Sequence, residues 1–261
     1  MILSVCITVF SLSAYHIYDY WKETQDSQRQ NDVLIDKAVE TAPQTQQTEN
    51  GQTESAIKPV SETAPITVDF ERLQEENKDI IAWLYCPDTE INYPVVQSKD
   101  NEYYLRRLLD GTWNIAGTLF MDYRNAADCS DLHTIIYGHN MRVKSMFGSL
   151  HDFESEDFYK KHNKIYLYQP GKTIKCTIYS VYDCLDKSAT YNTDFSDDGN
   201  DNKWVDWLTM TVNNNAYYPI KKKPAEKDHI ITLSTCSGKQ KGDSYRFVVH
   251  SLVTDTVIYE E

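Results

Sequence analysis

Three groups at the ends of predicted strands, a thiol, an imidazole and a guanidinium, are best suited to covalent chemistry in this sequence. The thiol belongs to Cys236, which ends the apolar run His229–Thr235. A rigid strand that ends at a cleft suits a nucleophile. Only the thiolate attacks a carbonyl, and an ordinary pKa of about 8.5 leaves little thiolate at pH 7. Taken alone, Cys236 would more often be a structural cysteine at the end of a buried strand.

The imidazole belongs to His139, which follows the predicted strand Thr134–Tyr137 and one glycine. Beside a thiol, an imidazole can form a thiolate–imidazolium pair or act first as base and then as acid. His139 and Cys236 are too far apart in the chain for local contact, but neighbouring strands can bring them together.

The guanidinium belongs to Arg246, which opens the next predicted strand after Cys236. The short loop between them returns the chain beside the preceding strand, so Arg246 can point at the same cleft. Its permanent charge and several donors suit it to hold an acyl carbonyl or an oxyanion. A surface arginine paired with Asp243 is the alternative if Arg246 is considered alone.

Short apolar runs divided by turn residues predict the elements that must position these groups. Around eight such runs predict a barrel or a sandwich of strands. The runs are Ile80–Cys86, Ile91–Val96, Gly117–Met121, Thr134–Tyr137, Ile165–Tyr168, Thr173–Tyr182, His229–Thr235 and Arg246–Val253. Helical patterns occur at Tyr103–Leu109, Ser145–Phe158 and Lys203–Val212, and Val68–Trp83 suits one or two short helices.

Composition divides the chain into three parts. Residues 1–21 begin with an apolar run and end in an aromatic belt, which predicts a membrane anchor, with a cleaved signal peptide as the alternative. Residues 22–66 are rich in Gln, Thr, Glu, Ser and Pro and predict a flexible extracellular stalk, in which a short helix at Asn31–Glu40 is possible. Residues 67–261 then form the folded domain.

Charge and cysteine spacing narrow the possible functions. The net charge of −13 argues against a nucleic-acid partner, because such partners require lysine and arginine to neutralise phosphates. The cysteines form no CxxC pair, so we expect no metal, and we expect no other cofactor. We also expect no disulfide framework, because the domain is large enough to bury its own core. The cysteines are Cys6, Cys86, Cys129, Cys176, Cys184 and Cys236.

One stretch of sequence resembles a known signature. Thr232-Leu-Ser-Thr-Cys236 resembles the TLxTC motif of sortases, the Gram-positive transpeptidases that attach surface proteins to the cell wall, and Gly138-His139 and Arg246 stand in the family's order. The resemblance covers about residues 67–261. Further stretches are similar to the class B subgroup: Tyr137–Met141, Ser145–Leu150, Asn92–Gln97, Asp100–Leu105, Phe120–Asn125 and a helical insert near Lys203–Tyr218.

The resemblance implies a mainly β fold: a closed eight-stranded barrel with N-terminal helices and an inserted helix before the cysteine strand. It also implies that Cys236 attacks the threonine carbonyl of a C-terminal sorting signal of NPxTx type and forms a thioester. His139 would protonate the leaving amine and then deprotonate an amine of a lipid II-type peptidoglycan precursor. The partners are then surface proteins that bear the signal, that precursor, and the cell membrane, which the enzyme would cross once with its catalytic domain outside.

The same resemblance suggests residues that contact the substrate. The backbone N–H of Ser237 would join Arg246 as the oxyanion donor. The others would line the groove: Asn101, Leu105, Ser234, Thr190 and Tyr191.

Two other functions remain open at this point. A plain cysteine peptidase would use the same residues with water as the acceptor. A surface-displayed binding module would keep Cys236 and His139 as structural residues only.

Overall fold

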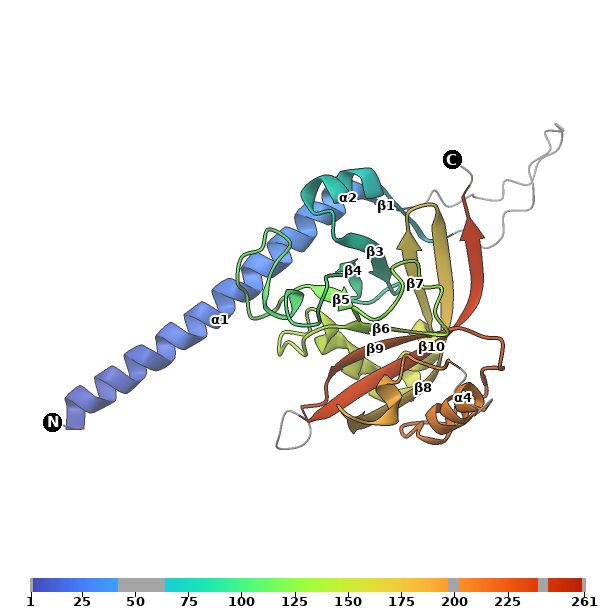
Figure 1. Cartoon of the computed structure of the whole chain (residues 1–261). Helices are drawn as coiled ribbons and strands as arrows, with labels where there is room; N and C mark the ends of the chain where they lie inside the picture. The colour runs from blue at the N-terminus through green and yellow to red at the C-terminus, as the bar shows by residue number, and fades with distance from the viewer. Residues whose placement is uncertain (1, 42–63, 197–201, 239–243, 260–261) are drawn as a thin grey trace, which may run out of the picture.

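The strands of the chain close into a barrel from which one long helix projects (Figure 1). The computed structural model describes residues 2–41, 64–196, 202–238 and 244–259. Around the barrel the strands follow the order β10-β8-β7-β3-β4-β5-β6-β9, and only the β4–β5 and β6–β9 pairs are parallel. The barrel strands are β3 (Ile80–Tyr85), β4 (Asn92–Val96), β5 (Leu119–Met121), β6 (His133–Tyr137), β7 (Lys164–Gln169), β8 (Lys172–Leu185), β9 (Ile230–Cys236) and β10 (Tyr245–Ile258).

Nearly continuous runs of β-branched and aromatic residues form these strands, because many strand residues are buried on both faces. Ile135, Leu233 and Val249 are fully buried on the neighbouring strands β6, β9 and β10. The predicted strands and the closed eight-stranded barrel are therefore confirmed.

Helices and a small sheet cover the outside of the barrel. Trp204, Trp207 and Leu208 of the inserted helix pack against residues of β8, β9 and β10, which confirms the predicted helix before the cysteine strand. The outer elements are α1 (Ile2–Ala38), β1 (Val39–Thr41), β2 (Ile66–Val68), α2 (Phe70–Glu76), η1 (Tyr104–Arg106), η2 (Phe147–Glu154), α3 (Glu156–His162), η3 (Ala189–Tyr191) and α4 (Lys203–Asn213).

Two predicted helices are shorter or broken in the structure. Only Tyr104–Arg106 of the expected helix Tyr103–Leu109 is helical, as one 3₁₀ turn. The expected helix Ser145–Phe158 divides into η2 and α3. The Ser155 side chain caps the start of α3 by accepting a hydrogen bond from the Phe158 N–H, so α3 begins anew at this point.

The first part of the expected flexible stalk, residues 22–66, is helical instead. Residues 22–38 continue α1 without a break and lie against the barrel. Leu34 and Ala38 are buried, and the Leu109 N–H donates to the Gln30 side chain at 3.0 Å. The polar composition was misleading because much of this docking is made by hydrogen bonds of polar side chains. Residues 39–41 form β1 and Ile66 begins β2, while residues 42–63 of the stalk prediction lie outside the described residues.

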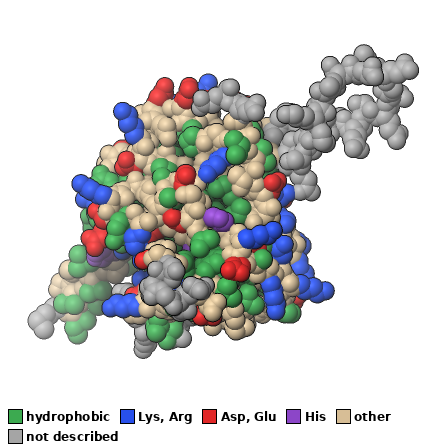
Figure 2. Space-filling view, turned by 45° about the vertical axis from the view of Figure 1, so that its right-hand side comes forward, with side chains coloured by type: hydrophobic (Ala, Val, Ile, Leu, Met, Phe, Trp, Pro, Cys, Tyr) green, Lys and Arg blue, Asp and Glu red, His purple; other side chains and the backbone are tan. Residues whose placement is uncertain are grey.

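The N-terminal part of α1 is exposed and apolar. Within the described residues, α1 is the single helix long and apolar enough to cross a membrane by length and composition. Figure 2 shows hydrophobic side chains along the end of α1 that projects at the lower left.

Candidate active site

Cys236, His139 and Arg246 line one cleft of about 410 Å³. Cys236 ends β9, and Arg246 lies directly opposite it on β10. On the other side of β9, Tyr137 of β6 lies opposite Ser234, so the chain that follows β6 brings His139 to the same edge. Three adjacent strands of the barrel thus bring together residues that are remote in sequence.

The His139 ring is held in one tautomer by the backbone. Its Nε2–H donates to the Leu105 carbonyl at 2.7 Å. Burial lowers the pKa of His139 below its ordinary value, although the hydrogen bond to Leu105 acts in the opposite direction. The neutral imidazole is therefore favoured at pH 7, with Nδ1 as its basic atom.

The backbone at Cys236 is held from one side by the segment that follows His139. The Cys236 carbonyl accepts a hydrogen bond from Asn140 Nδ2 at 2.9 Å, and His151 Nε2 lies 3.1 Å from the same oxygen. His151 also contacts Glu154 at 2.7 Å and stacks on Phe247. These contacts fix the backbone of Cys236, while the residue itself stays exposed.

The other cysteines of the folded domain are less accessible than Cys236. Burial raises the pKa of Cys86, Cys129 and Cys176 to about 12 and also raises the pKa of Cys184. These four thiols stay protonated at pH 7, so they are poor nucleophiles.

Arg246 is the cation of this edge. Its Nη1–H donates to the Tyr245 carbonyl at 3.2 Å, and its Nη2 lies 3.9 Å from Asp186 Oδ2. Its side chain is 27% exposed, so the guanidinium remains in reach of a molecule in the cleft.

Four of the residues predicted to contact the substrate line the cleft: Asn101, Leu105, Tyr191 and Ser234. Thr190 does not line it. Its side chain is buried, and its hydroxyl contacts the Tyr182 hydroxyl at 3.0 Å.

Ser237 also differs from the prediction. Its backbone N–H donates to the Tyr245 carbonyl at 3.1 Å, because the β9–β10 ladder extends one pair past Cys236. Its side chain is buried, outside the cleft lining. The Ser237 N–H, which we expected to bind the oxyanion, is therefore already hydrogen-bonded to the backbone. Of the two predicted oxyanion donors, Arg246 is the one that lines the cleft.

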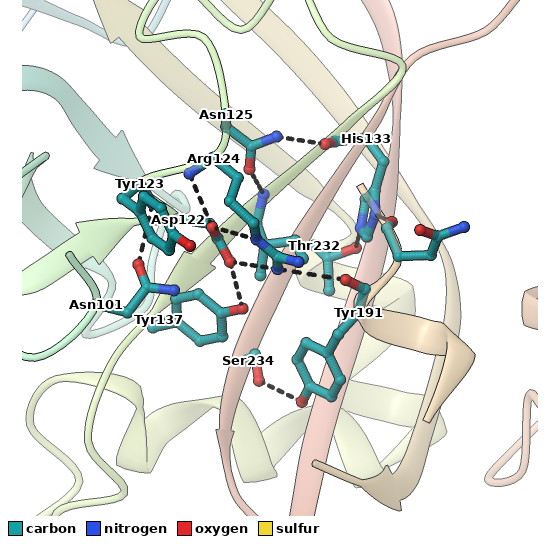
Figure 3. A network of polar contacts seen from close by, with 12 residues as sticks. Asn101, Asp122, Tyr123, Arg124, Asn125, His133, Tyr137, Tyr191, Thr232 and Ser234 are labelled. Carbon is teal, nitrogen blue, oxygen red and sulfur yellow. Dashed lines mark hydrogen bonds and ion pairs between the residues drawn. The ribbon is translucent and has the colours of Figure 1, made fainter. Parts of the chain in front are cut away.

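A polar network beside the cleft was not foreseen (Figure 3). The Arg124 guanidinium donates two hydrogen bonds to the buried carboxylate of Asp122, and the Tyr137 hydroxyl donates a third at 2.9 Å. Burial opposes ionisation of Asp122, but the hydrogen bonds from Arg124 and Tyr137 outweigh it and lower the pKa of that carboxyl. Arg124 also donates to the Tyr191 carbonyl at 3.3 Å. The network thus fixes one wall of the cleft.

The Tyr191 ring completes that wall. Its hydroxyl contacts the Ser234 hydroxyl at 2.8 Å, which joins η3 to the cysteine strand (Figure 3). Asp122 and Arg124 lie in Phe120–Asn125, a stretch that resembles class B sortases. The available signal was an acidic and a basic residue close together after the predicted strand Gly117–Met121, and it gave no partner.

Each residue of the signature Thr232–Cys236 has a place in the structure. The Thr235 hydroxyl donates to the Gly138 carbonyl at 2.8 Å, next to His139. A side chain at position 138 would collide with Leu119 and Phe147, which explains the glycine. Thr232 lies deeper, between two histidines.

Groups that could ligate a metal do not gather at the cleft or elsewhere in the described part of the chain. Across residues 2–41, 64–196, 202–238 and 244–259, no group of three or more His, Cys, Asp or Glu is arranged to hold a metal ion.

Comparison with known proteins identifies the family of this chain. The sortase domain family model matches residues 84–253. Sortase B of Listeria monocytogenes is 39% identical over 184 residues, which are 70% of this chain and 73% of that protein. Sortase B of Staphylococcus aureus is 32% identical over 182 residues, which are 69% of this chain and 72% of that protein.

Solved structures give the same result. The S. aureus sortase B–substrate complex superposes with a TM-score of 0.65 and 31% identity over 73% of this chain and 85% of that chain. Sortase B from B. anthracis in complex with AAEK1 superposes with a TM-score of 0.69 and 30% identity over 92% of this chain and all (100%) of that chain. The barrel, the cleft at its edge and these relatives together show that the chain belongs to the sortase family, as a class B sortase.

Proposed function

We propose that this sortase uses Cys236 to cleave a C-terminal sorting signal of NPxTx type after its threonine and transfers the protein to an amine of a peptidoglycan precursor. The observation that carries the proposal is the convergence of Cys236, His139 and Arg246 in one cleft. A thiol, a base and an oxyanion donor are the groups that acyl transfer requires.

In the first half of the reaction, the neutral His139 takes the thiol proton of Cys236 on Nδ1. The thiolate then attacks the threonine carbonyl carbon, and a C–S bond forms. The C–N bond breaks, and the leaving amine takes the proton from the imidazolium, which leaves a thioester and a neutral imidazole. The lowered pKa of His139 supports this order, because the ring is neutral before the thiol gives up its proton.

In the second half, an amine attacks the thioester. Nδ1 of His139 removes a proton from the amine nitrogen, an amide forms, and the C–S bond breaks. The imidazolium then returns its proton to the thiolate. Arg246 stabilises the oxyanion in both halves by charge-assisted hydrogen bonds, which are worth most in a partly desolvated cleft.

The cleft walls hold the signal peptide. Asn101, Leu105, Tyr191 and Ser234 line the cleft, and the Tyr191 hydroxyl contacts the Ser234 hydroxyl at 2.8 Å. A solved S. aureus sortase B–substrate complex supports a peptide signal as the occupant, and another sortase B structure is complexed with triglycine, a short peptide that begins with an amine.

The cellular placement is part of the proposal. Residues 1–21 anchor the enzyme in the cell membrane by a single pass, and the catalytic domain, 67–261, lies outside. The exposed apolar half of α1 supports this placement.

Product analysis tests the transfer. The enzyme is incubated with an NPxTx peptide, with and without triglycine. We expect a peptide–triglycine amide that grows with triglycine concentration. Cleavage that yields the same hydrolysed product with and without triglycine would support a cysteine peptidase instead. An uncleaved peptide library would support a binding module.

A further inference from the structure

Helix α1 joins the apolar N-terminal segment to the barrel without a spacer. It contains an 18-residue window of apolar character, and at about 1.5 Å per residue such a window is about 27 Å long, close to the ~30 Å core of a bilayer. Contacts with the barrel begin immediately afterwards. Tyr20 accepts a hydrogen bond from the Arg142 N–H at 3.3 Å, and the Glu23 carboxylate accepts one from the Ile115 N–H at 2.7 Å.

Two loops make these contacts, residues 107–118 and residues 139–146, which we call the helix-facing loops. Asn114 of the first loop donates from Nδ2 to the Glu23 carbonyl at 2.8 Å. Both loops lie on the side of the barrel from which the exposed half of α1 projects (Figure 1). Because the helix is continuous, a bilayer that holds the apolar half of α1 also determines how far these loops lie from the bilayer surface.

Each helix-facing loop exposes one large apolar side chain. Trp113 is 59% exposed on the first loop, and Val143 is 51% exposed on the second. Arg142 and Lys144 flank Val143 and are also exposed. Singly exposed apolar residues are ordinary on a soluble domain. Here Trp113 lines a pocket with Lys22 of α1, and the Arg142 N–H next to Val143 donates to Tyr20, so both loops lie beside the part of α1 that follows its apolar run. Tryptophan and cations are both typical of the interfacial region of a membrane.

The same loops border the cleft. His139 begins the second loop, and the Leu105 carbonyl that fixes the His139 ring lies just before the first. A bilayer surface that touches the helix-facing loops therefore lies beside the rim of the cleft. An acceptor amine linked to a lipid would reach the thioester from that surface.

We propose that Trp113 and Val143 insert into the headgroup region of the bilayer that α1 crosses, so that the cleft takes its amine from a lipid-linked acceptor. The inference rests on the proposed membrane anchor and transfer reaction. The bilayer is the occupant, because the apolar half of α1 continues without a break into the part of the helix that contacts both loops.

Tryptophan quenching tests the contact directly. The full-length protein is reconstituted in phosphatidylcholine–phosphatidylglycerol vesicles that carry bromine near the headgroup end of the acyl chains. We expect Trp113→Phe to lower the quenchable fluorescence, because Trp113 lies at the depth of the bromine. The control Trp204→Phe removes a buried tryptophan of α4 and leaves the quenchable part unchanged. An unchanged quenchable part in Trp113→Phe would overturn the inference.

A transfer assay tests the consequence. Trp113→Glu and Val143→Glu are compared with wild type, all in vesicles, with triglycine either free or attached to phosphatidylethanolamine. We expect transfer to the lipid-linked triglycine to fall by about tenfold, because the effective concentration of the amine at the cleft falls. Transfer to free triglycine should stay within about twofold of wild type, since neither residue lines the cleft.

The outcomes separate the two proposals. Equal losses with free and lipid-linked triglycine would show that the loops act on the cleft and not on the membrane, which overturns the inference. A wild-type enzyme that makes neither product would contradict the proposed function, whatever the quenching result.

Discussion

Three adjacent strands, β6, β9 and β10, supply two clusters of polar side chains, one buried in the fold and one at the cleft. Each strand or its end gives one residue to a buried cluster and one to the cleft. The buried cluster is His133, Thr232 and His250, and the cleft cluster is His139, Cys236 and Arg246. Both clusters contain histidine, so residue type alone does not separate a structural site from a reactive one.

In the buried cluster every polar atom of the two rings is satisfied. The His133 Nδ1–H donates to the Asn192 carbonyl at 2.7 Å, so its Nε2 accepts from the Thr232 hydroxyl, also at 2.7 Å. Thr232 in turn accepts from His250 Nδ1, and His250 Nε2 accepts from the Tyr182 hydroxyl at 3.0 Å. One backbone carbonyl thereby sets the direction of the whole chain of hydrogen bonds, with both rings neutral.

In the cleft cluster Cys236 is exposed, while His139 and Arg246 are half-buried and line the cleft. His139 is fixed through Nε2 by the Leu105 carbonyl, and Cys236 is fixed through its own carbonyl. The backbone is held while the reactive groups stay available. The comparison teaches that access to a cleft at the strand ends, and not the presence of histidine, distinguishes the candidate active site from the buried cluster.

The largest effect should follow from loss of the base. His139→Ala should lower kcat/KM for peptide cleavage by on the order of 10³–10⁴-fold, because the thiol then loses its proton acceptor. The thermal midpoint should change little, since His139 lies at the barrel edge. His162→Ala, which removes a histidine on α3 outside the cleft, is the matched control. A His139→Ala enzyme with wild-type rates would erase the distinction between the clusters.

Loss of the guanidinium geometry should have the next largest effect. Arg246→Lys keeps the charge but removes the planar fork, and we expect kcat to fall by about 10²-fold with a smaller change in KM. Arg72→Lys alters an exposed arginine paired with Asp69 and serves as the control. Equal falls in kcat for both variants would contradict the role of Arg246.

Substitutions in the buried cluster should lower the stability of the fold and not the rate of catalysis. Thr232→Val leaves nitrogens of two buried rings without a partner and should lower the free energy of unfolding by about 2 kcal/mol. Thr254→Val, at an exposed position, should cost much less. Urea unfolding measures both. A Thr232→Val protein that is as stable as wild type but impaired in catalysis would contradict the structural role of the buried cluster.

Acid should also act on the buried cluster. Burial lowers the pKa of His133 to about 4 and also lowers the pKa of His250. The unfolded chain binds protons below about pH 6.5 that the folded one excludes, so stability present above that pH is lost as the pH falls toward 4. Between pH 7 and pH 5, His133 alone should cost on the order of 2 kcal/mol, and His133→Gln should reduce the loss. An equal pH dependence in that variant would contradict this origin.

The smallest effect concerns the pKa of His139. The charge of Arg106 helps to lower it, after the larger effect of burial. Arg106→Gln should raise that pKa, so the acidic fall in kcat/KM should move to higher pH. Arg107→Gln is the control, because the Arg107 guanidinium lies over the Tyr103 ring. A shift to lower pH in Arg106→Gln would contradict His139 as the base.

The strand ends could be predicted from sequence because apolar runs and the signature Thr232–Cys236 locate them directly. The hydrogen bonds between segments that are distant in the sequence could not be predicted in this way. Nothing in the sequence shows that the Ser237 N–H pairs with Tyr245 or that Thr190 turns inward toward Tyr182. These features depend on strand register, which is set by long-range pairing.

The sequence also did not show that polar side chains of α1 hold this helix against the barrel. Residues 22–38 have the composition of a linker, yet the Glu23 and Gln30 side chains accept backbone N–H groups of the barrel loop 107–118. The pair Asp122–Arg124 likewise becomes informative only when Tyr137 and Tyr191 are seen around it (Figure 3).

Intact-protein mass spectrometry with peptide mapping tests the central assignment most directly. The enzyme is quenched with acid early in its reaction with an NPxTx peptide. We expect one acyl adduct, located on Cys236, and no adduct in Cys236→Ala. An adduct on another cysteine such as Cys184, or normal cleavage by Cys236→Ala, would contradict the account.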